Sequence, residues 1–289
     1  MNLPLDRFIQ AVKTRLLPSK LFIRNEYKNR TGRELNLNSP KTFSEKIQWL
    51  KLYYKNPVLT KMADKVDSKD IVRKKVGEIH VIPSYKVYKT ADDIIHDELP
   101  DEFALKATHG SGWNIIETDK NNITESEIRD YFRFWLKKSY YKGSKEWAYK
   151  HIQPRVVCEK LIFEEDGSLP EDYKFFCFNG VPTYIQIDHG RFEKHTRSFY
   201  NTCWEKMPFS IGYPLEESVV EKPANFEKMI DIASSLSEGL PFLRVDMYNV
   251  SGQIYVGELT CYPGNGLEKF SDEKWDFKLG EKLNIGSHN

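Results

Sequence analysis

Apolar residues recur at helical spacing through the first third of the chain. Thr42-x-x-Glu45 has the capping-box pattern that starts a helix, and apolar residues follow it at intervals of three and four. A second helix is predicted over 65–75, because Gly77 behind it is a typical C-terminal cap. The N-terminal part of the chain is therefore predicted to be mainly helical.

Beyond residue 100 the apolar residues gather in short runs that suit strands. One pair of runs meets at Asn179-Gly180, two residues that favour the positive φ angles of a tight hairpin turn. Further helices are predicted from Thr124 and from Asn225. The predicted extended segments cover 80–83, 85–88, 103–106, 113–116, 155–162, 173–178, 181–187, 242–248 and 253–261. Together these elements predict an α+β chain in which antiparallel sheets carry packed helices.

Composition narrows the class of protein. With 40% hydrophobic residues the chain has ample material for a core, and its net charge of +1 argues against a broad nucleic-acid surface. The four cysteines include no C-x-x-C pair, which favours free thiols in a reducing cytosol over zinc or disulfides. No apolar stretch has the length of a membrane span, and a cytoplasmic protein is expected. Residues 3–21 are expected to form a lid or packing helix, with peripheral binding to the inner membrane face as the alternative.

Charged residues interrupt the last predicted pair of strands. Because strand side chains alternate, Arg244 and Asp246 share one face of their strand, and Glu258 and Thr260 share one face of theirs. If the two faces coincide, two carboxylates and a guanidinium converge, and carboxylate oxygens suit Mg²⁺. A surface sheet with ordinary ion pairs is the alternative.

The register of this strand pair decides whether such a metal site exists. The charged faces coincide only when opposed residues have numbers with an even sum. A five-residue connection over 249–253 is expected to give that register and to place Asp246 diagonal to Glu258, whereas a four-residue connection would not. Asp246→Asn is then expected to cut turnover by orders of magnitude and leave stability nearly intact or raised, since the two carboxylates would no longer repel each other.

The turn after the last strand favours the functional interpretation. It reads Pro-Gly-Asn-Gly, a sequence suited to presenting backbone N–H groups to an oxyanion. Gly264 and Asn265 are therefore predicted to bind substrate.

Lys106 is another charged residue in an apolar run, and it stands before the loop Gly110-Ser111-Gly112. Glycines let backbone amides approach phosphate closely, and the lysine would neutralise its charge. The loop matches neither a Walker motif nor a dinucleotide fingerprint, and a plain hairpin turn would explain it alone. Glu159, at the end of a predicted strand, could hydrogen-bond an adenine edge but is nondescript by itself.

Taken in order, these elements resemble the ATP-grasp superfamily. Its pattern is Asp-Lys before a helix, a strand lysine with a glycine-rich loop, an acidic hinge, Arg-x-Asp, and Glu-x-Asn-x-x-Pro-Gly. The matching segments are Asp64-Lys65, Lys106 with 110–112, Glu159-Lys160-Leu161, Arg244-Val245-Asp246 and 258–264. A closer resemblance, to the TupA-like ATP-grasp proteins of bacterial surface-polysaccharide synthesis, runs from about Tyr27 to Leu283. The segments that carry it are 39–47, 99–103, 172–174, 191–195 and 275–276.

The resemblance implies an ATP-grasp fold with the nucleotide clamped between two lobes. It implies an N-terminal helical region over 1–60, an ATP-grasp domain over 61–283 and a tail over 284–289. The two lobes would cover 99–162 and 170–270.

The resemblance also implies a role for each matched position. Arg244 would steady the reacting carboxylate, with Lys106 as the second catalytic residue, and Asp172 would contact the ribose. The residues implied to bind ATP are Lys65, Lys106, Gly110, Ser111, Gly112, Glu159, Lys160, Leu161, Asp172 and Lys174. Those implied to bind Mg²⁺ are Asp246, Glu258 and Thr260. Thr260 replaces the usual asparagine, so a second metal ion is in doubt.

The acceptor site is expected around Arg191, His195 and Arg197, which stand among aromatic residues. Cationic donors beside aromatic rings suit an anionic sugar such as a hexuronate, and a solvated loop with structural arginines is an equal alternative. His109 is expected to be a hydrogen-bonding loop residue rather than a base.

The expected activity joins an amine to a carboxylate through an acyl phosphate, with ATP and Mg²⁺. The substrates would be an amine or amino acid and a uronic acid of a capsule, O-antigen or teichuronic-type polysaccharide, free, lipid-linked or nucleotide-linked. A sugar phosphotransferase would use the same nucleotide site and stays open. A glycosyltransferase is disfavoured because the chain has no D-x-D pattern. A non-catalytic binding module is disfavoured by the combined presence of the phosphate and metal candidates.

Overall fold

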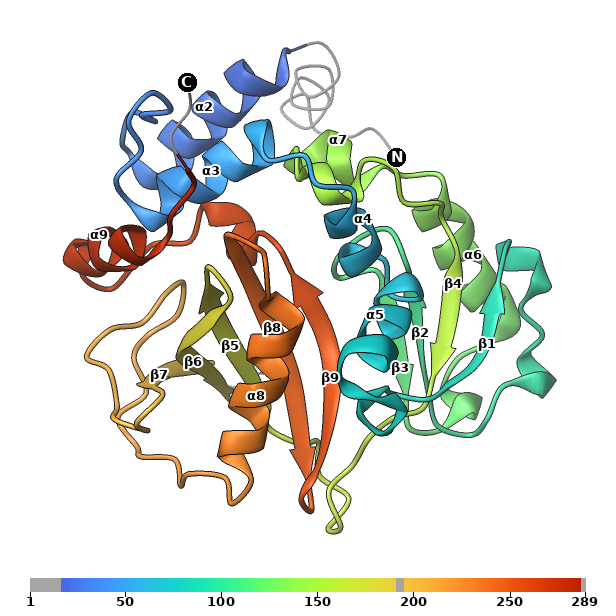
Figure 1. Ribbon diagram of the computed structural model, residues 1–289. Helices are drawn as coiled ribbons and strands as arrows, with labels where there is room; N and C mark the ends of the chain where they lie inside the picture. Colours follow the sequence, from blue (N-terminus) through green and yellow to red (C-terminus); the bar gives the residue numbers. More distant parts are fainter. Residues whose placement is uncertain (1–16, 191–194, 287–289) are drawn as a thin grey trace.

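The computed structural model describes residues 17–190 and 195–286 (Figure 1). Its helices are α2 (Ser19–Thr31), α3 (Phe43–Tyr53), α4 (Val58–Ala63), α5 (Asp67–Val76), α6 (Glu125–Leu136), α7 (Tyr140–Ser144), α8 (Phe226–Ser237) and α9 (Glu273–Lys282). Its strands are β1 (Ser84–Tyr88), β2 (Phe103–Ala107), β3 (Asn114–Glu117), β4 (Val156–Glu159), β5 (Asp172–Phe178), β6 (Val181–His189), β7 (Thr196–Asn201), β8 (Phe242–Val250) and β9 (Gln253–Thr260). The helix expected over 3–21 lies largely outside the described residues.

The strands form two antiparallel sheets, of order β1-β4-β2-β3 and β7-β6-β5-β8-β9. Helix α5 lies between them, beside the edge strand β9 (Figure 1). The segment before β1 joins the two sheets through a bridge between Val81 and Val256. The predicted α+β class, with antiparallel sheets, packed helices and a helical N-terminal region, is confirmed.

Helix α6 covers one face of the four-stranded sheet. The Thr124 side chain caps it in the predicted capping box, and its buried Ile128 and Phe132 pack with Phe103 and Leu105 of β2. Because side chains alternate along β2, Ala104 and Lys106 lie on the other face, which is turned toward α5 and β9. Apolar packing on one face thus leaves the opposite face for charged residues.

Helix α8 covers one face of the five-stranded sheet. Its Phe226 ring lies 5.9 Å from the Phe175 ring of β5. The predicted β5–β6 hairpin is confirmed, with φ angles of 52° at Asn179 and 81° at Gly180. The other face of this sheet is divided: its aromatic half packs against Phe43 of α3, and its remaining half is charged.

Two predicted boundaries are wrong. Residues 80–83 were expected to be extended, but His80 ends a 3₁₀ turn over Glu78–His80, and extended backbone begins at Val81. The strand expected over 155–162 ends at Glu159, because the backbone N–H of Lys160 leaves the β2–β4 ladder and donates to the Pro83 carbonyl. These differences concern the edges of elements and leave the sheet order intact.

The register of β8 and β9 puts the charged faces together by a different route from the expected one. The connection has two residues, Ser251 and Gly252. In the pairs next to it the two residue numbers have an odd sum, as in Val250 with Gln253. A β-bulge between the pairs Met247–Val256 and Asp246–Glu258 then adds one residue, Gly257, to β9. The expected five-residue connection is therefore wrong, while the predicted shared face is confirmed. Asp246 lies directly opposite Glu258 rather than diagonal to it.

Helix α9 crosses the beginning of α3 and fixes the helical region on the sheet. Asp276 accepts a hydrogen bond from the Ser44 backbone N–H (2.8 Å). The Lys46 ammonium donates to the carbonyl groups of Gly280 and Leu283, both at 2.8 Å. A Cβ atom at Gly280 would lie 2.1 Å from the Lys41 carbonyl oxygen, so only glycine permits this approach.

We expect Gly280→Ala to destabilise the protein by about 2 kcal/mol or more, since the new methyl group would overlap backbone atoms. Gly143→Ala in α7 is the matched control, because a Cβ atom there meets nothing within 4 Å. The control should stay within about 1 kcal/mol of the parent chain. Urea unfolding of the three proteins measures the difference. Equal stability of the two variants would show that α9 can move away from α3.

Candidate functional site

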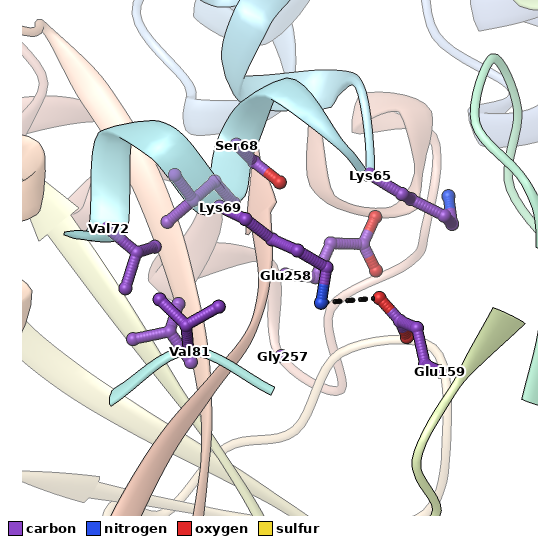
Figure 2. A pocket seen from close by; sticks show the side chains of 10 residues that line it. Lys65, Ser68, Lys69, Val72, Val81, Glu159, Gly257 and Glu258 are labelled. Carbon is purple, nitrogen blue, oxygen red and sulfur yellow. Dashed lines mark ion pairs between the residues drawn. The ribbon is translucent and has the colours of Figure 1, made fainter. Parts of the chain in front are cut away.

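A pocket opens between α5, the end of β4 and the edge strand β9 (Figure 2). It brings together side chains that are far apart in the sequence and come from both sheets. The residues that line it are Lys65, Ser68, Lys69, Val72, Val81, Glu159, Val256, Gly257, Glu258 and Leu259. Its charged members are lysines and glutamates, which suits a highly charged ligand.

Lys65 is held at the start of α5 by its neighbour Asp64. The buried Asp64 carboxylate accepts hydrogen bonds from the backbone N–H groups of Val66 (2.8 Å) and Asp67 (3.2 Å), which fixes the turn that leads into α5. Its other oxygen accepts from Arg155 at 2.8 Å. The Lys65 ammonium then donates to the Gly110 carbonyl at 2.6 Å. In this Asp-Lys pair, Asp64 fixes the turn before α5, and Lys65 points its ammonium group at the glycine-rich loop.

The Glu159 carboxylate lies between two ammonium groups. Its two oxygens are each 2.7 Å from a lysine nitrogen, Oε1 from Lys69 and Oε2 from Lys106. Although burial opposes its ionisation, the charges of Lys106 and Lys69 hold the pKa of Glu159 below its usual range. This differs from the expected adenine contact, because both carboxylate oxygens already bind lysines. Lys160, which is exposed, and the half-buried Leu161 follow it out of the sheet.

The glycine-rich loop is held in place by aromatic rings. A Cβ atom at Gly110 would lie 2.5 Å from the Trp113 ring, so glycine is needed for this close approach. The ring of Tyr140 is 5.7 Å from that of Trp113, and its hydroxyl is hydrogen-bonded to Ser111. His109 donates through Nε2 to the Trp135 carbonyl at 3.2 Å, which confirms it as a hydrogen-bonding loop residue.

The predicted metal candidates lie side by side on the five-stranded sheet. Arg244 stands opposite Thr260 and Asp246 opposite Glu258. Arg244 donates to both oxygens of Asp246 at 2.7 Å, and to the Thr260 hydroxyl at 3.1 Å. Burial raises the pKa of Asp246 to about 6, and the positive charge of Arg244 opposes that shift.

The same charged face continues across the sheet toward β7. Lys174 of β5 stands opposite Asp246, forms an ion pair with Asp172, and lies 3.3 Å from Asp188 of β6. Asp188 in turn pairs with Arg197 of β7. We call this row the charged floor; its members are Asp172, Lys174, Asp188, Arg197, Arg244, Asp246, Glu258 and Thr260. Asp172 therefore lies on the same face as the metal candidates, and its ribose contact stays a prediction.

The donor set fits Mg²⁺ shared with an anionic ligand. Asp246 and Glu258 supply hard oxygens from directly opposed positions about 5 Å apart in backbone terms, and Thr260 adds a hydroxyl. Within the part of the chain that the structure describes, no group of three or more His, Cys, Asp or Glu residues could hold a metal by itself. A magnesium ion that keeps waters or phosphate oxygens as further ligands is consistent with so few carboxylates.

The predicted acceptor residues lie at the far end of the floor. The Arg197 guanidinium pairs with Asp188 and donates to the Ile211 carbonyl, and it lies 4.8 Å from the centre of the Tyr213 ring. The His195 ring stacks on the same tyrosine at 3.6 Å. Arg197 is therefore a buried structural cation in this arrangement, and the half-buried His195 is better placed for a ligand. Arg191 lies outside the described residues.

The turn after β9, η6 (Pro263–Gly266), is only partly as expected. The backbone N–H of Asn265 donates to the Tyr262 carbonyl at 3.0 Å, so it is not directed at an oxyanion. Asn265 accepts hydrogen bonds from the buried Lys51 through both its side chain and its backbone. The Asn265 N–H is thus already engaged within the turn, and the substrate-binding roles of Gly264 and Asn265 stay predictions.

Sequence reasoning missed Lys69. Its signal was present, since it follows Lys65 by four residues and helical spacing places such residues on one face. It also missed the buried pair of Lys51 and Glu146, which lie 95 positions apart along the chain and influence each other's charge. Only the fold brings that second pair together.

Comparisons with known proteins give a family match and several similar solved structures. The family model of TupA-like ATPgrasp matches residues 45–284. The comparison with curated proteins gives no match. One similar solved structure is D-alanine–D-alanine ligase from Bacillus anthracis complexed with ATP, at 21% identity over 70% of this chain and 54% of that chain, with a TM-score of 0.44. The chain thus spans about half the length of that ligase.

Two further similar structures have lower identity. ATP-grasp ligase PsnB complexed with a minimal precursor is 12% identical over 83% of this chain and 68% of that chain, with a TM-score of 0.45. Another is N5-carboxyaminoimidazole synthase from Aspergillus clavatus in complex with ADP and 5-aminoimidazole ribonucleotide. It is 10% identical over 70% of this chain and 45% of that chain, with a TM-score of 0.43. Separately, every helix within 17–190 and 195–286 is too short or too polar to cross a membrane.

Asp246→Asn is expected to change how stability depends on pH. Burial raises the pKa of Asp246 from 3.8 to about 6, so the folded protein binds this proton more tightly than the unfolded chain. The resulting stabilisation is present below about pH 4 and is lost as the pH rises through 6. The variant has no carboxyl group at this position and so does not lose this stabilisation as the pH rises. Its free energy of unfolding should therefore increase by on the order of 2 kcal/mol relative to the parent between pH 4 and pH 7.

Thermal or urea unfolding across that pH range measures the gain. Arg244 retains its hydrogen bond to Thr260 and the attraction of Glu258 and Asp172, which limits the loss from removing its partner. Asp231→Asn, at an exposed position of α8, is the matched control and should show no such gain. A variant that loses stability relative to the parent as the pH rises would contradict this account.

Proposed function

The chain belongs to the TupA-like ATP-grasp family, and on that premise we propose that it is an ATP- and Mg²⁺-dependent carboxylate–amine ligase. The observation that carries the proposal is the meeting of two charged surfaces at one pocket. Lys65 and Lys69 line it from one side, and Glu258, which stands opposite Asp246 on the floor, lines it from the other. Lys106 is connected to the pocket through its ion pair with Glu159. This combination suits a nucleoside triphosphate whose phosphates contact the lysines and share a magnesium ion with the carboxylates.

In the proposed reaction an oxygen of the substrate carboxylate attacks the γ-phosphorus of ATP, and ADP leaves. An amine then attacks the acyl phosphate, the C–O bond to phosphate breaks, and the amide and inorganic phosphate are released with one proton. Bound Mg²⁺, held by Asp246, Glu258 and Thr260, would neutralise phosphate charge. Arg244 would orient the substrate carboxylate once its own partner Asp246 turns to the metal. The protein thus contributes positioning and charge.

The glycine-rich loop would cover the phosphates in this proposal. Lys65 already binds the Gly110 carbonyl, so the cation and the loop that would close over a phosphate are connected before any ligand arrives. Ser111 and Gly112 are exposed next to it and free of strand pairing. The adenine would lie against the backbone of Lys160 and Leu161, where the chain leaves the four-stranded sheet.

We further propose that the carboxylate substrate lies along the charged floor toward β7. The floor spans five strands, roughly 19 Å at the usual strand spacing, so it reaches well beyond the pocket that Glu258 lines. His195 stacked on Tyr213 ends it with aromatic rings and a polar imidazole, groups that suit a sugar. We therefore propose a uronic acid of a bacterial surface polysaccharide as carboxylate substrate, an amine or amino acid as the second substrate, and a cytoplasmic place of action.

Nucleotide binding tests the first part of the proposal. ATP or ADP with Mg²⁺ should raise the melting temperature by several degrees, because a ligand at 100 times its Kd stabilises the folded state by about 2.7 kcal/mol. NAD and UDP-sugars should have no such effect. Lys65→Met should weaken ATP binding at least tenfold, while Lys61→Met, an exposed position of α4, should leave it unchanged. A shift with UDP-sugars and none with ATP would instead indicate a glycosyltransferase.

Product analysis tests the reaction. With a ¹⁸O-labelled hexuronate, an amino acid, ATP and Mg²⁺, a ligase should form ADP, an amide and inorganic phosphate that carries one ¹⁸O atom. Asp246→Asn should form all three at least 100-fold more slowly, since the metal loses a ligand. Formation of ADP and a phosphorylated sugar, with no free phosphate, would show a phosphotransferase and contradict the ligase proposal.

A further inference from the structure

Lys69 and Lys106 bind the same carboxylate but are held differently. Each nitrogen is 2.7 Å from one oxygen of Glu159. The Lys69 nitrogen also donates to the backbone carbonyl of Ile82 at 2.6 Å, which fixes it from a second direction. For Lys106, Glu159 is the acceptor that the structure provides among the described residues. Lys69 is therefore anchored twice, while Lys106 is held by one exchangeable ion pair.

The positions of the two lysines in the fold also indicate that Lys69 is fixed and Lys106 is free to exchange its partner. Lys69 lies inside α5, and its side chain is 14% exposed. Lys106 lies on β2 next to the glycine-rich loop and is 23% exposed, so it is the more accessible of the two to an anion arriving under that loop. Figure 2 shows Lys69 reaching over the pocket to Glu159, with Lys65 and Glu258 beside it.

Release of Lys106 would be unfavourable without a second partner for Glu159. The Glu159 side chain is only 6% exposed, and a buried carboxylate that loses all its cations is strongly destabilised. With Lys69 in place, Glu159 keeps one ion pair when Lys106 turns to a phosphate. Without Lys69, Lys106 would be the last cation on a buried anion, and a phosphate would have to compete with Glu159 for it.

We propose that Lys69 is a positioning residue: it holds the Glu159 carboxylate in place so that Lys106 can exchange between Glu159 and a nucleotide phosphate. This rests on the proposed nucleotide function and adds to it a residue that acts through another side chain. Glu159 is then the internal counter-ion of the phosphate-binding lysine, in place of the adenine contact first expected from its position.

A double-mutant cycle on ATP binding tests the proposal. Lys69→Met should raise the Kd for Mg-ATP at least tenfold in the parent chain, because Glu159 then retains Lys106. In the Glu159→Gln background no buried anion competes for Lys106, and the same change should raise the Kd less than threefold. Lys74→Met, which removes the same charge from an exposed position of α5, should change the Kd less than twofold in either background.

The two backgrounds separate positioning from direct contact with the nucleotide. If Lys69 touched phosphate itself, Lys69→Met would weaken binding equally in both backgrounds, and that result would overturn the proposal. Lys69→Gln, which keeps a donor for the Ile82 carbonyl, serves as the second variant if Lys69→Met unfolds. It too should raise the Kd at least tenfold in the parent chain and less than threefold in the Glu159→Gln background. Failure of the parent chain to bind Mg-ATP at all would remove the nucleotide function and this inference with it.

Discussion

The arrangement of the site depends on one backbone irregularity, the bulge at Gly257 in the β8–β9 ladder. Val256 pairs with Met247 and faces the apolar core, while Glu258 pairs with Asp246 and faces the charged floor. In a regular strand these two residues would share a face, because side chains alternate with period two. Either an apolar residue would then join the floor, or a carboxylate would enter the core, which is strongly unfavourable without a partner. The extra residue removes this conflict.

Pairing of buried charges is the second constraint. The pocket and the floor hold lysines, arginines and carboxylates at high density, and most are connected in alternating order, as in Lys69–Glu159–Lys106 and Lys174–Asp188–Arg197. Alternation lets like charges lie close together without unfolding the protein. It also means that an anionic ligand is bound by exchange of partners, so the strength of each internal pair sets how readily a cation is released.

Much of the fold could be predicted from the sequence, because its signals are local. Capping boxes at Thr42 and Thr124 and the Asn179-Gly180 turn depend on residues within a few positions of one another, and all three are present. The β8–β9 register could not be predicted from loop length, because the bulge at Gly257 changes the pairing in the middle of the ladder. The partners of Glu159 were equally hidden: one lies on a helix 90 positions away, and the choice between adenine and lysine is made by tertiary packing.

The two sheets have separate apolar cores, and this separation explains why charged residues gather between them. One core lies under α6, and the other joins α8, the N-terminal helices and the five-stranded sheet. Along their border the sheets meet through α5 and the Val81–Val256 bridge, where charged side chains lie beside buried valines. Burial there lowers the pKa values of Lys65 and Lys69, and the carboxylates that face them oppose this shift. A polyanion bound with a cation at this border would connect the two cores, so ligand binding and the relative position of the sheets are coupled by the same charges.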